Sequence, residues 1–178
     1  MGTRVNLAVL ALLALAWLGL SARAPARIIV EVASSSLGPL EESVASDRSD
    51  GAALLALSEA YVDAGYPALA VVTLLRADHA LLDEPAVAHQ LARAYELSGR
   101  LRQAVAAADL AFHRCVSLLE PVNSARPTTA CDELMLTRLD RHKSALERMV
   151  RWGVVDPRVD PRAERAYERG VCGLRRLY

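Results

Sequence analysis

Apolar residues recur at intervals of three and four positions through the middle of the chain, with polar and charged residues between them. This spacing places the apolar side chains along one side of an α-helix. It predicts two successive pairs of antiparallel helices between residues 51 and 117, and an all-α fold for the chain as a whole. The apolar positions of the four helices are, in order, Leu54, Leu57 and Tyr61, then Ala70, Leu74 and Ala77, then Ala88, Leu91 and Tyr95, then Ala104, Ala108 and Ala111.

The two predicted pairs repeat each other at a period of 34 residues. Tyr61 and Tyr95 are separated by this interval, and five further pairs share it. A repeat of this length is typical of stacked helical units. Gly65 and Gly99 each follow the first helix of a unit, where the chain needs a positive φ to turn back, and glycine adopts this without steric cost. The five further pairs are Leu57 with Leu91, Ala60 with Ala94, Gly65 with Gly99, Ala70 with Ala104, and Ala77 with Ala111.

This order of apolar, small, Tyr, Gly and Ala positions resembles the tetratricopeptide repeat (TPR), a helix-turn-helix unit, over about residues 51 to 117. The resemblance implies a short TPR-like α-solenoid of antiparallel helix pairs. It also implies that a peptide or partner helix binds in a concave groove lined by the first helix of each repeat. The groove positions carried over are Leu55, Glu59, Val62 and Asp63 from the first unit, and His89, Arg93, Glu96 and Leu97 from the second.

Two units are fewer than the three or so that a stacked array needs to be stable. Residues 118–178 are therefore predicted to form a C-terminal helical cap. A long helix is expected to end near Trp152 and Gly153, and a last helix to run from about Pro161 to Leu177. One face of the first helix carries Met135, Leu139, His142, Leu146, Met149 and Val150, and the apolar stripe of the second carries Ala163, Ala166, Tyr167, Val171 and Leu174.

Residues 1–26 have the pattern of a signal sequence or an N-terminal membrane anchor. Arg4 precedes an apolar run from Val5 to Leu20, and small residues follow. The run is longer than a typical signal core and a little short of the roughly 20 residues of a comfortable membrane span. Cleavage and retention as a transmembrane helix both stay open, with a buried helix as a third reading. Residues 27–50 are expected to be a tether with a short helix.

With either a signal or an anchor, the rest of the chain lies outside the cytoplasm. A retained anchor predicts a protein of the bacterial inner membrane that faces the periplasm. Cleavage predicts a periplasmic or secreted protein.

The composition excludes several functional classes. Lysine and arginine together number 21, as do aspartate and glutamate, and aromatic residues make up 4% of the chain. A neutral chain with few aromatic rings lacks the positive field and the stacking surfaces that nucleic-acid-binding proteins use. Its apolar share of 53% is too high for a disordered chain. Phosphate-binding glycine loops, nucleophile elbows and HExxH motifs do not occur, so we expect neither a cofactor nor enzymatic activity.

Cysteine is the residue type with the most chemical interest. Cys115, Cys131 and Cys172 are an odd number, and two of them are expected to pair in an exported chain. Cys115 ends the second unit and Cys131 precedes the next helix, so this pair is the preferred disulfide. Another pairing and three free thiols stay open. His113 and His142 near these cysteines match no structural zinc spacing, so we expect no metal.

The sequence thus predicts a protein-protein interaction adaptor or scaffold whose partner is another protein. It contacts a membrane through the N-terminal segment if that segment is uncleaved. The alternative is a structural subunit of an obligate cell-envelope complex, in which the groove is filled permanently.

Overall fold

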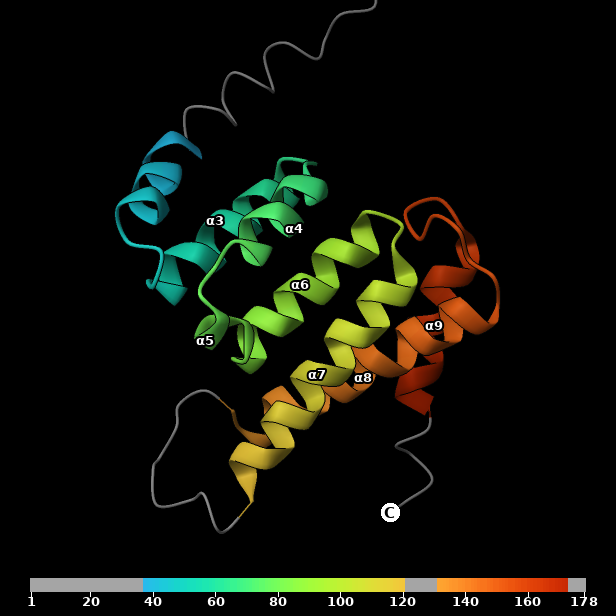
Figure 1. Ribbon diagram of the computed structural model, residues 1–178. Coiled ribbons are helices and arrows are strands. Elements are labelled where there is room, and N and C mark those ends of the chain that lie inside the picture. Colours follow the sequence, from blue (N-terminus) through green and yellow to red (C-terminus); the bar gives the residue numbers. More distant parts are fainter. Residues whose placement is uncertain (1–36, 121–130, 173–178) are drawn as a thin grey trace, which may run out of the picture. The chain divides into compact units, whose positions relative to one another are not determined.

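The computed structural model describes residues 37–120 and 131–172, and every regular element in these two ranges is a helix (Figure 1). The all-α prediction is therefore confirmed for this part of the chain. The helices are residues 37–46, α3 (Gly51–Asp63), α4 (Pro67–Leu75), α5 (His79–Leu82), α6 (Pro85–Leu97), α7 (Leu101–Leu119), α8 (Glu133–Arg151) and α9 (Pro161–Cys172).

Across the described ranges, no helix combines the length and the apolar character needed to cross a membrane. The predicted signal or anchor, residues 1–26, lies outside these ranges. The same holds for the end of the predicted last helix, beyond Cys172.

Helices that follow one another along the chain also pack against one another. α3 packs against α4, and both pack against α6. α6 then packs against α7, α7 against α8, and α8 against α9. Figure 1 shows α6, α7 and α8 side by side, with α9 next to α8. Each helix of the series is therefore held between neighbours that are close in sequence.

The turns after α3, α6 and α8 share one geometry. Gly65, Gly99 and Gly153 have φ angles of 82°, 72° and 66°, which confirms the positive φ expected at the first two. In each turn the N–H of the glycine donates to the carbonyl three residues earlier, and the next N–H donates to the carbonyl five residues earlier. These paired hydrogen bonds satisfy carbonyl groups that the helix end leaves without partners.

Small residues bring the paired helices close together. Ala70 of α4 and Ala104 of α7, which are 34 residues apart, are both completely buried. Ala108 of α7 is buried in one cluster with Leu146 and Met149 of α8. Alanine has little side chain to keep two helix backbones apart, so the core between α6, α7 and α8 is dense but contains few large residues.

The helix at residues 37–46 belongs to the core. This segment was expected to be a tether with a short helix, and the helix is present and packed. Leu37 is buried, Leu40 and Val44 pack on the same apolar cluster as α3, and the Tyr61 hydroxyl donates a 2.6 Å hydrogen bond to Glu41. Burial and the Glu41 carboxylate raise the pKa of Tyr61 to about 12.

We expect Gly99→Ala to lower the free energy of unfolding by about 1–2 kcal/mol, because an L side chain at positive φ is strained. The loss should exceed that of Gly65→Ala, since a Cβ at position 99 would lie 3.3 Å from the Val155 carbonyl oxygen, whereas none lies within 4 Å at position 65. Urea unfolding measures both. Gly38→Ala, at a helical site with open space around it, is the matched control and should cost nothing. Equal losses in all three variants would contradict this account.

Candidate functional site

The residues predicted to line a groove lie on α3 and α6, which pack against each other. Within each helix they recur at helical spacing, so each set occupies one side of its helix. Their positions range from exposed, at Glu59 and Asp63, through half-buried, at Leu55, Val62, His89, Arg93 and Leu97, to buried, at Glu96. We call this the α3–α6 face.

Arg93 connects the two helices of this face. Its Nη1 lies 3.6 Å from the Glu59 carboxylate on α3, and it donates a 3.2 Å hydrogen bond to the Gln90 side chain on α6. The Arg93 and Glu59 side chains are 39% and 60% exposed. An ion pair this exposed contributes only about 0–1 kcal/mol. A charged group of a partner is therefore able to replace either member at little cost.

The sequence predicts that Glu96 lines an open groove, but in the structure Glu96 is buried. It is only 8% exposed, because side chains from α8 and α9 cover it. His142 Nε2 lies 3.0 Å from Glu96 Oε2, and the Tyr167 hydroxyl donates a 2.7 Å hydrogen bond to Oε1. Both oxygens of the carboxylate are thus engaged. Glu96 joins three helices and is not free to meet a partner.

His89 lies beside this cluster. Its ring meets the His142 ring edge to face, with centroids 5.0 Å apart. Burial, together with the nearby His142 and Arg93, lowers the pKa of His89 to about 4. His89 is therefore uncharged at neutral pH. Burial and the Glu96 carboxylate also raise the pKa of Tyr167 above its ordinary value.

The sequence placed His142 and Tyr167 on the apolar stripes of the cap helices but did not connect them with Glu96. Nothing local indicates the link, since Glu96 and His142 are 46 residues apart. The one available signal was a polar residue within each apolar stripe. In the part of the chain that the structure describes, no group of His, Cys, Asp and Glu is arranged to hold a metal ion. The hydrogen bonds of His142 and Tyr167 to Glu96 make this cluster a junction of α6, α8 and α9.

Cys115, near the end of α7, and Cys131, just before α8, form a disulfide with their Cα atoms 5.5 Å apart. Both are buried in one apolar cluster with Ala88 of α6 and Leu139 of α8. The bond closes the connection between α7 and α8. It thus fixes where α8 begins relative to α7.

Reduction of this disulfide should lower the free energy of unfolding by roughly 3 kcal/mol, because the unfolded chain regains the freedom of a loop of this size. Thermal unfolding with and without a reductant measures the change. A Cys115→Ala, Cys131→Ala double variant should start at the lower stability and show no response to the reductant. A wild-type chain that is equally indifferent to the reductant would contradict the prediction.

Acidification is expected to destabilise the fold through His89. Its pKa in the folded protein, about 4, lies below the ordinary 6.5, so the unfolded chain binds the proton first. The free energy of unfolding should therefore fall as the pH drops from about 6.5 to about 4, by roughly 1–3 kcal/mol.

Urea unfolding at a series of pH values tests this sign. His89→Asn should flatten the dependence between pH 6.5 and 4, whereas the exposed His79 on α5 offers a control, His79→Asn, that should not. An unchanged slope in His89→Asn would show that other groups carry the effect.

Comparisons of this chain with known proteins found no match. No family model matches the sequence, no curated protein matches it, and no solved structure matches the chain.

Proposed function

We propose that this protein is a TPR-type adaptor that binds a peptide or a partner helix on its α3–α6 face. The observation that carries the proposal is the exposed Arg93–Glu59 pair, which spans the two helices that repeat at 34 residues. The half-buried Leu55, Val62 and Leu97 lie around it. These three side chains offer apolar surface that a partner can bury, and the charged groups of Arg93 and Glu59 can make directional contacts with it.

The fold supports the proposal in a second way. The paired helices, the shared glycine turns after α3 and α6, and the buried alanines at matching positions are compatible with a short helical solenoid, in which each repeat packs on its neighbours. The third helix pair, α8 and α9, follows with the same type of turn at Gly153. In the proposal it completes the three units that a stable array needs.

We also propose that the protein acts outside the cytoplasm. The apolar run from Val5 to Leu20 would hold it in a bacterial inner membrane, or direct its release into the periplasm after cleavage. The Cys115–Cys131 disulfide supports this location, because disulfides persist in oxidising compartments.

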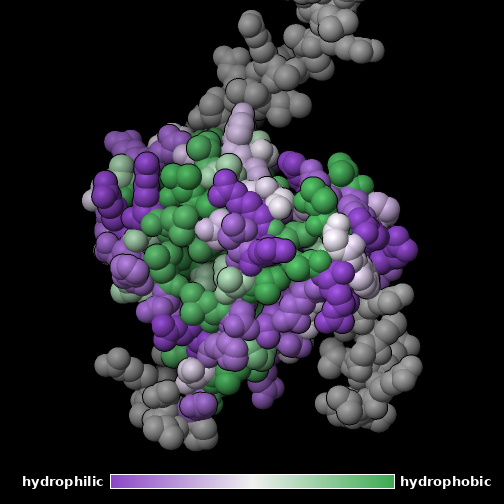
Figure 2. Space-filling model, turned by 45° about the vertical axis from the view of Figure 1, so that its right-hand side comes forward, coloured by the Kyte–Doolittle hydropathy of each residue, from purple (hydrophilic) through white to green (hydrophobic). Residues whose placement is uncertain are grey.

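The alternative function, a subunit of an obligate cell-envelope complex, is favoured by α4. This helix contains no charged residue between Pro67 and Leu75, yet Leu69, Val72 and Leu75 are 48%, 45% and 50% exposed. Helices that are apolar on all sides are usually covered. On the face of the molecule in view, Figure 2 shows hydrophobic residues gathered between hydrophilic ones.

A photocrosslinking amino acid at Val62 is expected to capture a discrete partner in cells. Arg93→Ala should reduce the captured amount several-fold, because it removes the charged contact at the centre of the face. Arg102→Ala, at an exposed arginine of α7, is the matched control and should leave capture unchanged. The products are identified by mass spectrometry.

Two further crosslinking positions separate the functions. Capture at Glu164, exposed on α9, without capture at Val62 would overturn the adaptor proposal. Quantitative capture at Val72 that is insensitive to Arg93→Ala would favour the obligate subunit instead.

A further inference from the structure

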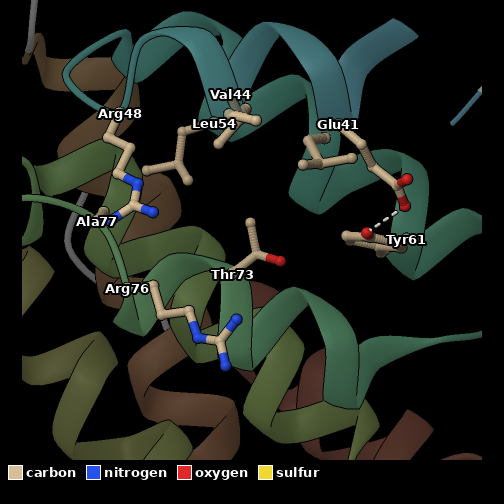
Figure 3. Close-up of a pocket in the computed structure, with 10 residues that line it drawn as sticks. Glu41, Val44, Arg48, Leu54, Tyr61, Thr73, Arg76 and Ala77 are labelled. Carbon is tan, nitrogen blue, oxygen red and sulfur yellow. Dashed lines mark hydrogen bonds between the residues drawn. The ribbon is translucent and has the colours of Figure 1, made fainter. Parts of the chain in front are cut away.

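A pocket of about 220 Å³ lies between the helix at residues 37–46, α3 and α4 (Figure 3). On α3 its wall includes Leu57. Leu57 and Glu59 are two residues apart, about 200° around the helix. The pocket is therefore on the opposite side of α3 from the α3–α6 face, and it is independent of the proposed partner site.

The interior of the pocket is largely apolar. Val44 comes from the helix at residues 37–46, Leu54 and Leu57 from α3, and Ala77 from the turn after α4. Leu54 and Leu57 belong to the buried core, so their positions are held by packing on all other sides. This interior suits an aliphatic group.

Two arginines stand on one side of the pocket. Arg48 follows the helix at residues 37–46, and Arg76 caps the end of α4. Figure 3 shows the Arg48 guanidinium group to the left of Thr73 and the Arg76 guanidinium group below it, both away from Glu41, which lies at the right. Among the described residues, neither Arg48 nor Arg76 has a carboxylate within ion-pair distance, whereas several arginines in other parts of the described structure do, namely Arg93, Arg114, Arg158 and Arg162.

The carboxylate that does line the pocket is on the other side and is already engaged. Glu41 accepts the hydrogen bond of Tyr61 (Figure 3). The pocket therefore differs between its two ends: at one end are two arginines that form no ion pair with a described residue, the middle is apolar, and the Glu41 carboxylate lies at the far end.

We propose that this pocket binds a monomeric aliphatic carboxylate. The head group accepts hydrogen bonds from Arg48 and Arg76, a geometry that guanidinium groups favour. The hydrocarbon stem lies against Leu54 and Leu57. A small anion such as acetate leaves the apolar interior uncovered, and an uncharged hydrocarbon leaves both arginines without a partner.

Shape distinguishes a free ligand from a membrane surface. The pocket is a recess bounded by three helical segments, and a flat bilayer surface does not enter such a recess. A single short stem does. The Glu41 carboxylate at the far end also opposes a ligand with a second negative charge.

The test uses the full chain in nanodiscs of phosphatidylcholine and a photoreactive aliphatic carboxylate that carries a diazirine on its stem. We expect labelling to map to residues 37–77. Excess octanoate should compete with it, while acetate and octanol should compete at least about tenfold less well, because each lacks one of the two recognised parts.

An Arg48→Gln, Arg76→Gln double variant should lose labelling by about tenfold or more. Both arginines are exposed, so the fold should survive, and circular dichroism verifies this. An Arg102→Gln, Arg141→Gln double variant removes two exposed arginines from α7 and α8 and should label normally.

Three results would overturn the proposal. The first is equal labelling by a diazirine alcohol of the same stem. The second is labelling that the Arg48→Gln, Arg76→Gln variant leaves intact. The third is loss of labelling when phosphatidylglycerol replaces phosphatidylcholine, which would identify a lipid head group as the occupant.

Discussion

The described structure depends on turns at which a glycine in the left-handed backbone conformation reverses the chain. Gly65, Gly99 and Gly153 each end a helix with the same pair of backbone hydrogen bonds. The turn sets the direction of the returning helix, and the small residues that follow set its distance. Ala70 and Ala104, both completely buried, allow that helix to lie close. Larger residues at these positions would push the helices apart, even with the turns intact.

Glu96 imposes a second constraint, of a different physical kind. A buried carboxylate is costly unless its oxygens accept hydrogen bonds. His142 and Tyr167 meet that need from α8 and α9. The apolar contacts between these helices are not directional, whereas the hydrogen bonds are, so the polar junction favours one placement of α8 and α9 on α6. It also divides the α3–α6 face into an open part around Arg93 and a covered part around Glu96.

α3 separates the two surfaces at which binding is proposed. Glu59 lies on the side shared with Arg93, and Leu57 lies on the side covered by the helix at residues 37–46. That helix has two effects. It shields an apolar side of α3 that the first repeat would otherwise expose, and it brings Arg48 to the end of the pocket.

The sequence by itself determined the long helices, their 34-residue repetition and the glycine turns, because these depend on interactions within a few residues of each other. It did not predict the short α5, and it carried the second helix to Ala77 although α4 ends at Leu75. It also singled out Cys115 and Cys131 and put Arg93 on the correct helix. Only the tertiary structure decided that Glu96 is buried and that Arg48 and Arg76 share one pocket. Such pairings join residues that are distant along the chain, and the packing of whole helices sets them, so no local spacing encodes them.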